Sequence, residues 1–579
     1  MASGRASGRS GSAPSGFDRP SALGRLAEER FDVLVIGGGI TGAGVALDAA
    51  ARGLRTALVE QEDFGAGTSS RSSKLVHGGL RYLQRGEIGL VHEGLAERQL
   101  LLTNAPHLVE PLALVIPLFG HGLRGRLSAL AASGALFAYD AAGGWRIGRR
   151  HRRLGRDEVL SRLSTLKAQP VTSGIEYWDA RTDDARLTLA VAKTAVLDHG
   201  ATVVNHARVT ELLSSPGGRV AGARVLATAP ARNPPMTTID VKTIDVRATV
   251  VVNATGVWAE EVQELAGTRG ERMAIRPAKG VHVTVPRERL PWLDAAVLPV
   301  PGEGRTIFAI PWGADVYLGT TDTPYDGALD DPRCTEDDLR YLLHAVNAVT
   351  SDSLGPEDVT AAWAGLRPLL GAPPPTKRVA LPRSSPSSTA DLSRRHQVSV
   401  SPSGLVTVTG GKLTSYRAMA ADATDEVVRM LGRRDRSPTR RLALRGASGT
   451  ASLRDGDAAS RLGADPLLLG HLVARYGGET TALLALIRED PGLAQPLVGG
   501  LPYVAAEAVY AAREEMALTL EDVLSRRLRA LPRRCRATAD AAPLVAGLVA
   551  PVLHWREEEE RCELEGLATA AARYRVARP

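Results

Sequence analysis

The first clear pattern of apolar and polar positions lies near the N-terminus. Residues 31–36 form an apolar, β-rich run, residues 40–52 carry an alanine-rich helical pattern, and residues 55–60 form a second apolar run. Gly53 closes the helical pattern, and Glu60 ends the second run. Short apolar runs are typical of buried strands, and glycine is a common helix terminator. The segment therefore predicts a strand, a helix and a second strand, which together begin a βαβ unit.

The middle of the chain predicts many further strands. Short stretches that alternate or run apolar occur at residues 202–211, 219–228, 247–253, 281–285 and 315–319. Strands of this kind, spread over a long segment, are typical of a large sheet.

The pattern changes again toward the C-terminus. A stretch rich in Pro and Ser at residues 372–388 predicts a surface loop, and polar and basic residues near position 435 mark a domain boundary. From residue 457 to 577 Ala, Leu, Arg and Glu recur at helical spacing, which predicts a helical domain.

Composition limits the class of protein. The 579 residues exceed what one core usually supports, so two or three domains are expected. The Lys and Arg residues outnumber Asp and Glu by 71 to 64, which makes anionic ligands plausible.

The three cysteines, Cys334, Cys535 and Cys562, are few and far apart, which suits a reducing, cytoplasmic compartment. No apolar run reads as a signal peptide or a membrane span, and residues 1–29 are expected to be a disordered tail.

A glycine-rich motif joins the first predicted strand to the first predicted helix. Residues 37–42 read GGGITG, with Gly37, Gly39 and Gly42 at the positions of the dinucleotide-binding fingerprint and Ile40 and Thr41 between them. Gly37 permits the tight turn, Gly39 lets the backbone approach a pyrophosphate, and Gly42 lets the helix pack on the strand. Glu60 could accept hydrogen bonds from the adenosine ribose. The motif predicts a nucleotide cofactor and leaves NAD and FAD both open.

The block that follows carries a resemblance to a known family. Residues 67–83, GTSSRSSKLVHGGLRYL, closely resemble a signature of the FAD-dependent glycerol-3-phosphate dehydrogenases of the bacterial aerobic type. Similar blocks follow in the family's order at 177–187, 253–258, 276–283, 310–325, 365–369 and 410–417, and the helical tail is similar at 471–477 and 521–530.

The resemblance implies an α/β fold with a Rossmann-like FAD-binding domain, a mostly antiparallel β substrate domain and a C-terminal helical domain. It assigns residues 30–110, completed by 195–270 and 391–434, to the FAD-binding domain, residues 111–194 and 271–390 to the substrate domain, and residues 435–579 to the helical cap. The implied reaction is oxidation of sn-glycerol 3-phosphate to dihydroxyacetone phosphate, with hydride passed to FAD and electrons passed to a membrane quinone.

Specific residues are expected to form the site. Besides the glycine motif and Glu60, the FAD-binding set is Thr68, Ser69, Ser70, Lys74, His77, Gly78, Gly79, Ala254, Thr255, Gly256, Gly411, Lys412, Leu413 and Thr414. A phosphate ester needs several cationic donors. The substrate-binding set is Arg81, Tyr82, His282, Arg367, Arg395 and Lys412, and the match of Arg395 is less secure because Arg394 adjoins it. The catalytic set is His77, His282 and Arg367, with either histidine open as the general base or as a structural residue.

The expected partners include a membrane surface. An apolar stretch at residues 127–145 precedes six arginines, a combination suited to anionic lipid, although a solvated basic loop beside a core helix would look the same. These arginines are Arg146, Arg149, Arg150, Arg152, Arg153 and Arg156. The protein is expected to be cytoplasmic and peripheral on the inner face of the membrane, without nucleic acid, and a homodimer is compatible with the sequence.

Two rival functions stay open at this level. One is a flavin amino-acid oxidase of the same broad fold, and the other is a non-catalytic FAD-binding or nucleic-acid-binding scaffold. No metal site is expected, because C-x-x-C, H-E-x-x-H and an EF-hand loop do not occur in the sequence.

Overall fold

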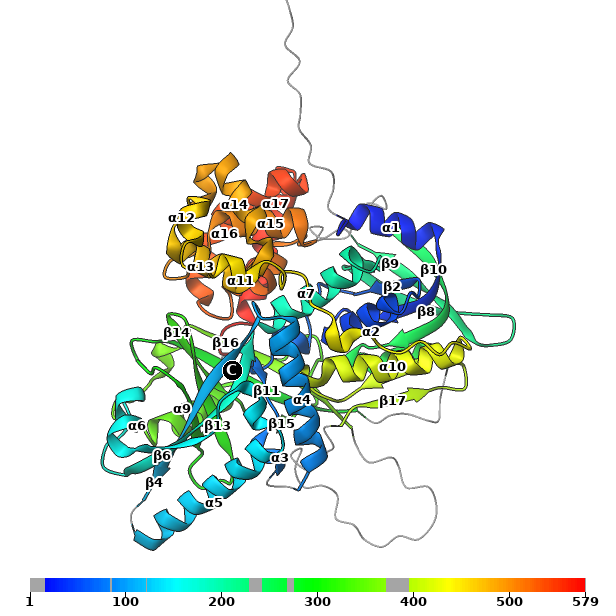
Figure 1. The fold of residues 1–579 in the computed structure, drawn as a ribbon. Helices are drawn as coiled ribbons and strands as arrows, with labels where there is room; N and C mark the ends of the chain where they lie inside the picture. The colour runs from blue at the N-terminus through cyan, green and yellow to red at the C-terminus, as the bar shows by residue number, and fades with distance from the viewer. Residues whose placement is uncertain are drawn as a thin grey trace, which may run out of the picture.

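The computed structural model describes residues 16–83, 86–120, 122–228, 242–267, 275–370 and 395–577. In these ranges two large sheets lie side by side and a helical domain packs against both (Figure 1). The predicted three-part architecture is confirmed.

The first sheet has eight strands and carries the predicted βαβ unit. Its central order is β17 (Gln397–Val400), β18 (Val406–Thr409), β10 (Lys242–Asn253), β1 (Arg30–Ile36), β2 (Thr56–Val59) and β7 (Thr202–Val204). Strands β18, β10, β1, β2 and β7 run parallel, and β8 (Ala207–Ser214) and β9 (Val220–Ala227) extend β10 as antiparallel strands. Strands buried on both faces are continuously apolar, which is why 31–36 shows no alternation.

Three helices cover one region of this parallel sheet. Helix α2 (Ile40–Ala51) packs between α7 (Asp184–Leu197) and α10 (Tyr416–Met430). Helix α7 therefore packs with the predicted FAD-binding domain, whereas residues 111–194 were expected to belong to the substrate domain. The helix follows directly after the long strand β6 (Val171–Thr182) of the other sheet. No change in composition therefore marks the point where the chain passes from one domain to the other.

The expected disordered tail is wrong from residue 16 onward. Asp18 caps helix α1 (Arg19–Glu28), whose Ala22 and Leu26 are buried against the first sheet. Arg19 donates hydrogen bonds to the carbonyl oxygens of His206 and Thr228. The Gly/Ser-rich residues 1–15 lie outside the described part of the chain.

The second sheet has ten strands and is mostly antiparallel. Its order is β15 (Thr323–Pro324), β11 (Ile275–Pro286), β14 (Asp315–Gly319), β13 (Thr306–Trp312), β12 (Ala295–Pro299), β4 (Val109–Phe119), β6 and β3 (Leu75–Val76), with β16 (Ala361–Leu370) beside β11 and β5 (Arg152–Gly155) beside β6. Strand β3 lies in this sheet rather than in the FAD-binding domain, because the segment after the first βαβ unit passes between the two sheets.

The helical domain begins after residue 437 and is joined to the rest by buried charges. Its helices are α11 (Thr450–Leu453), α12 (Ala458–Leu462), α13 (Pro466–Tyr476), α14 (Thr480–Glu489), α15 (Ala505–Glu514), the π-helical segment η10 (Asp522–Arg527), α16 (Cys535–Leu553) and α17 (Glu557–Ala572). Helix α16 has the length and apolar character of a membrane span, whereas no apolar run of that length was expected. It packs against α15 and α17, and 28% of its apolar window is buried.

Candidate active site

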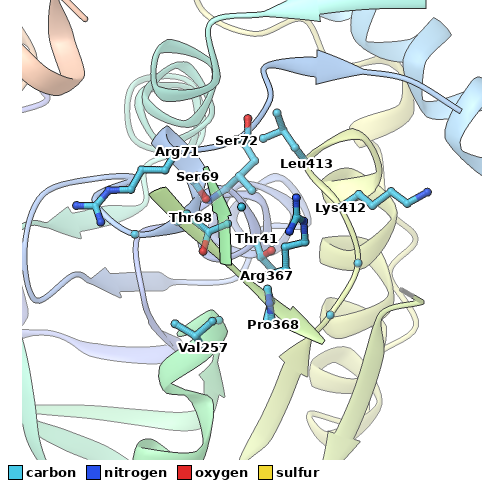
Figure 2. A pocket seen from close by; sticks show the side chains of 18 of the residues that line it. Thr41, Thr68, Ser69, Arg71, Ser72, Val257, Arg367, Pro368, Lys412 and Leu413 are labelled. Carbon is cyan, nitrogen blue, oxygen red and sulfur yellow. The ribbon is translucent and has the colours of Figure 1, made fainter. Parts of the chain in front are cut away.

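A cavity of about 920 Å³ is lined by residues from both sheets. Figure 2 shows side chains from the first βαβ unit, the segment at residues 68–72, strand β16 and the turn after β18 gathered around it. The parallel strands end at this cavity, which is where open α/β sheets bind their ligands.

The predicted glycine turn forms one wall. Gly37 has φ +106°, in the region that favours glycine, and Gly37, Gly39, Ile40 and Thr41 line the cavity. Gly42 is not in the lining, and a Cβ there would collide with the Gly37 carbonyl oxygen. It thus allows the close helix contact that the motif predicts.

Glu60 follows β2 at the same wall. Its carboxylate accepts hydrogen bonds from Gly38 N at 2.6 Å and Glu62 N at 2.9 Å. Burial raises the pKa of Glu60 to about 7 against these hydrogen bonds. A carboxylate at this position is ready to accept hydrogen bonds from ribose hydroxyls, the role predicted from the sequence.

Two other turns of the first sheet reach the cavity. Ala254, Thr255 and Gly256 follow β10, and the lining residues after β18 include Gly411, Lys412, Leu413 and Thr414. Thr414 Oγ1 accepts a hydrogen bond from His77 N at 3.1 Å, so this turn also touches the segment at residues 67–83.

Thr68 and Ser69 come from that segment and complete the cradle. Ser69 Oγ accepts a hydrogen bond from Ile40 N at 2.9 Å, and a Cβ added to Gly39 would lie 3.1 Å from the same oxygen. The cavity is thus lined by glycine turns, hydroxyls and a helix N-terminus. Groups of this kind fit the pyrophosphate and ribose of FAD.

The predicted cationic residues lie at another part of the cavity. Arg367 projects from β16 and lines the cavity, and Lys412 Nζ lies 3.6 Å from the centre of the Tyr82 ring. The guanidinium of Arg367 already has a carboxylate partner, because its Nη1 donates to Asp322 Oδ1 at 3.1 Å. A Cβ added to Gly280 would lie 2.6 Å from Arg367 Nη2, so this glycine makes room for the guanidinium.

His282 lies on the neighbouring strand β11, where it pairs with Trp363, four positions along β16 from Arg367. The ring is 2% exposed, stacks on Trp363 with centroids 4.9 Å apart, and shares a 2.8 Å hydrogen bond between Nε2 and Ser73 Oγ. Burial, with smaller contributions from the charges of Lys74 and Arg367, lowers the pKa of His282 well below its usual value. The ring is therefore a neutral imidazole at physiological pH.

Several predicted residues lie outside the cavity lining. Ser70 O accepts a hydrogen bond from Arg529, Lys74 Nζ lies 3.4 Å from Asp184 Oδ2, and Gly78 N donates to Tyr139 Oη. Arg395 is exposed and is not in the cavity lining, although its carbonyl oxygen lies next to the lining residue Gly410. The side chain of Arg81 lies outside the described part of the structure, while its backbone belongs to helix α3 (Leu80–Leu83).

Other lining residues were not singled out from the sequence. Ser73 and Gly280 fall inside blocks that carry the family resemblance, and Thr320 and Asp322 fall inside the block at 310–325. Motif position alone indicates that these residues are near the site, but only the strand pairing brings them against His282 and Arg367. In the described ranges, no group of three or more His, Cys, Asp or Glu side chains comes together as a metal site.

Comparison with known proteins agrees with this geometry. The family model "FAD dependent oxidoreductase" matches residues 32–420, and "C-terminal domain of alpha-glycerophosphate oxidase" matches residues 437–560. Glycerol-3-phosphate dehydrogenase 2 of Mycobacterium tuberculosis (strain ATCC 25618 / H37Rv) is 42% identical over 92% of this chain and 86% of its own length. The aerobic glycerol-3-phosphate dehydrogenase of Staphylococcus epidermidis (strain ATCC 12228 / FDA PCI 1200) is 33% identical over 94% of this chain and 95% of its own length.

A solved structure shows the same fold. The glycerol-3-phosphate dehydrogenase of Bacillus halodurans, complexed with FAD, superposes with a TM-score of 0.76 and 31% identity over 97% of this chain and 98% of the other. Together, the nucleotide cradle, the matched family models and these relatives show that the chain belongs to the FAD-dependent glycerol-3-phosphate dehydrogenases.

Proposed function

We propose that the protein oxidises sn-glycerol 3-phosphate to dihydroxyacetone phosphate. The observation that carries this proposal is the arrangement of Arg367, Lys412 and the neutral His282 at one cavity, whose other walls carry the nucleotide cradle. FAD, when bound in that cradle, supplies the acceptor for the hydride that leaves C2.

The cationic residues would bind the phosphate. A guanidinium can bind two phosphate oxygens at once, and an ammonium acts as a compact positive charge. Asp322 and Thr320 hold the Arg367 guanidinium at 3.1 and 3.3 Å, so its direction is set before the substrate arrives. Tyr82, Lys412 and, by its place in the motif, Arg81 complete the proposed phosphate site.

The proton of the C2 hydroxyl needs an acceptor. His282 is our proposed general base, because its ring is neutral and lines the same cavity as the proposed phosphate residue Arg367. His77 also lines the cavity and stays a second candidate for this role. A general base of this kind typically accelerates proton transfer by about 10² to 10⁴.

A membrane quinone is our proposed electron acceptor. Leu80, Ile116, Ala132, Ala135 and Phe308 contribute apolar side chains to the cavity lining. Two of them belong to helix α5 (Gly122–Ala141), which runs along the edge of the molecule opposite the helical domain (Figure 1). Apolar side chains of this kind suit a quinone ring better than they suit the phosphate substrate.

The same helix supports peripheral docking on the inner face of the cytoplasmic membrane. Leu130, Phe137 and the nearby Trp145 are 64%, 70% and 55% exposed. Of the basic residues that follow, Arg149, Arg150, Arg152, Arg153 and Arg156 are exposed, and Arg152 is also paired with Glu158 and Glu176. Exposed apolar and tryptophan side chains beside arginines are typical of membrane-surface helices.

Sedimentation with liposomes tests the docking surface. We expect the holoenzyme to bind vesicles containing anionic lipid, and the double variant Leu130→Glu/Phe137→Glu to stay in the supernatant. Leu467→Glu is the control, because this leucine is 84% exposed on α13 in the helical domain. Equal binding by both variants would contradict the assignment of α5.

Anaerobic reduction tests the reaction itself. Glycerol 3-phosphate should bleach the flavin absorption of the purified holoenzyme, and a soluble quinone should restore it. An unchanged spectrum would overturn the proposal and favour a non-catalytic scaffold. Peroxide production with glycine or sarcosine, without reduction by glycerol 3-phosphate, would favour an amino-acid oxidase.

A further inference from the structure

Ser73 lies between the cavity and the buried His282. Its side chain is partly exposed in the cavity lining, and its Oγ is 2.8 Å from His282 Nε2. His282 itself is 2% exposed, and its Nδ1 is buried with no hydrogen-bond partner among the described residues. A substrate hydroxyl in the cavity can therefore reach the serine hydroxyl more directly than the ring nitrogens.

The position of Ser73 is set by its neighbours on both sides. Ser72 donates to Asp184 Oδ2 from its backbone N at 3.0 Å and from its Oγ at 2.8 Å. Lys74 Nζ lies 3.4 Å from the same carboxylate. Lys74 also has φ +56°, a conformation that is uncommon for residues other than glycine and that surrounding contacts must hold.

A further hydrogen bond holds the backbone of Ser73. The Tyr317 hydroxyl of β14 donates to Ser73 O at 3.0 Å. With Ser72 and Lys74 bound to Asp184, the side chain of Ser73 is left to face His282. Asp184 and Lys74 are thus positioning residues for this contact.

The groups around His282 favour its neutral form. Lys74 lies over the Trp363 ring on which His282 stacks, with Nζ 4.5 Å from the ring centroid, and Arg367 faces His282 from β16. Tyr317 contacts the ring from β14 as an uncharged phenol. A resting imidazolium would lie near two cations, which is costly. The neutral ring with its proton on Nδ1 keeps the Nε2 lone pair to accept a hydrogen bond from Ser73 Oγ.

We propose that Ser73 is a catalytic residue that relays the substrate proton to His282. The proposal rests on the proposed function and extends it. The C2 hydroxyl gives its proton to Ser73 Oγ, Ser73 gives its own proton to His282 Nε2, and the C2 carbonyl forms as hydride leaves C2. The serine is unchanged at the end of the step. The negative charge of the bound phosphate offsets the nearby cations while the imidazolium holds the proton, which is then released to water.

Ligand binding tests the contact without turnover. In the oxidised holoenzyme, dihydroxyacetone phosphate can accept a hydrogen bond from Ser73 at its C2 oxygen, whereas 3-hydroxypropyl phosphate has no oxygen at C2. Ser73→Ala should lower the affinity for dihydroxyacetone phosphate by about three- to tenfold, the effect of one neutral hydrogen bond. The affinity for 3-hydroxypropyl phosphate should stay within about twofold of wild type. Equal weakening of both ligands in calorimetry would mean a structural role and would overturn the proposal.

Stopped-flow reduction tests the proton transfer. Ser73→Ala should lower the rate constant of flavin reduction by roughly 100-fold at unchanged FAD content, and Ser73→Thr, which keeps a hydroxyl, should recover most of that loss. A Ser73→Ala rate constant within about threefold of wild type would overturn the relay. If wild-type flavin is not reduced at all, the proposed function fails first, which is a different result from a fast Ser73→Ala variant.

Discussion

Arg367, our proposed phosphate-binding residue, has a charge that already has a protein partner in Asp322. Replacing it by Ala removes charge-assisted hydrogen bonds of about 1.5 to 3 kcal/mol, so KM for glycerol 3-phosphate should rise by roughly 10- to 100-fold. FAD content should stay close to that of wild type, because the nucleotide cradle lies on other segments. Steady-state kinetics and the flavin-to-protein absorbance ratio measure both quantities.

Arg395 provides a matched control for that variant. It was also predicted to bind substrate, yet it is exposed and outside the cavity lining. Arg395→Ala should leave KM unchanged. Loss of bound FAD in Arg367→Ala would instead move Arg367 to the cofactor site.

Glu60 makes the apoprotein sensitive to pH. Its pKa is raised to about 7 by burial, so the folded state holds a proton that the unfolded state releases near pH 4.5. Stability therefore falls as pH rises from about 4.5 through 7. Glu60→Gln should remove this pH-dependent part of the free energy of unfolding. Urea unfolding of the apoprotein at pH 5 and pH 8 would then show a smaller loss of stability between the two pH values in the variant than in wild type. An equal loss in both proteins would contradict the assignment.

At the scale of elements, the contact between β1 and α2 depends on Gly42. A Cβ there would collide with the Gly37 carbonyl oxygen, and the backbone cannot move without opening the turn. Gly42→Ala should yield protein without FAD and with a lower midpoint of thermal unfolding. Gly24→Ala in α1 is the control, because its Cβ would meet nothing within 4 Å. That variant should bind FAD normally and gain up to about 1 kcal/mol from helix propensity.

At the scale of the whole molecule, buried ion pairs join the helical domain to the FAD-binding domain. Arg527 of η10 donates to Asp63 through Nη1 at 2.5 Å and Nη2 at 2.8 Å, and both side chains are almost fully buried. Asp63 follows Glu60 in the loop after β2. The helical domain therefore supports the segment that lines the nucleotide cradle.

Breaking that pair should destabilise the protein. Arg527→Met leaves buried charge with fewer partners, and the free energy of unfolding should fall by about 3 to 5 kcal/mol. Arg461→Met is the control, because Arg461 and Asp455 are more than half exposed and such pairs contribute about 0 to 1 kcal/mol. Denaturant unfolding, followed by flavin fluorescence and circular dichroism, measures the free energy of unfolding of both variants. A loss of similar size in the two variants would contradict the role of the buried pair.

The sequence by itself determined the local elements and the class of cofactor. The glycine turn, its flanking strands and Glu60 could be predicted because each depends on contacts within about 30 residues of chain, and the block at 67–83 was specific enough to identify FAD. Arg367 and Lys412 were found by the same kind of motif.

Only the tertiary structure decided what faces those residues. Lys74 lies in a cofactor-like motif but pairs with Asp184, and Ser73 beside it reaches His282, which is 209 positions away in the chain. Helix α1 likewise gains its order from packing on the first sheet rather than from its own composition. These outcomes depend on long-range pairing and on the high cost of burying a charge without a partner, and neither is visible in a local pattern.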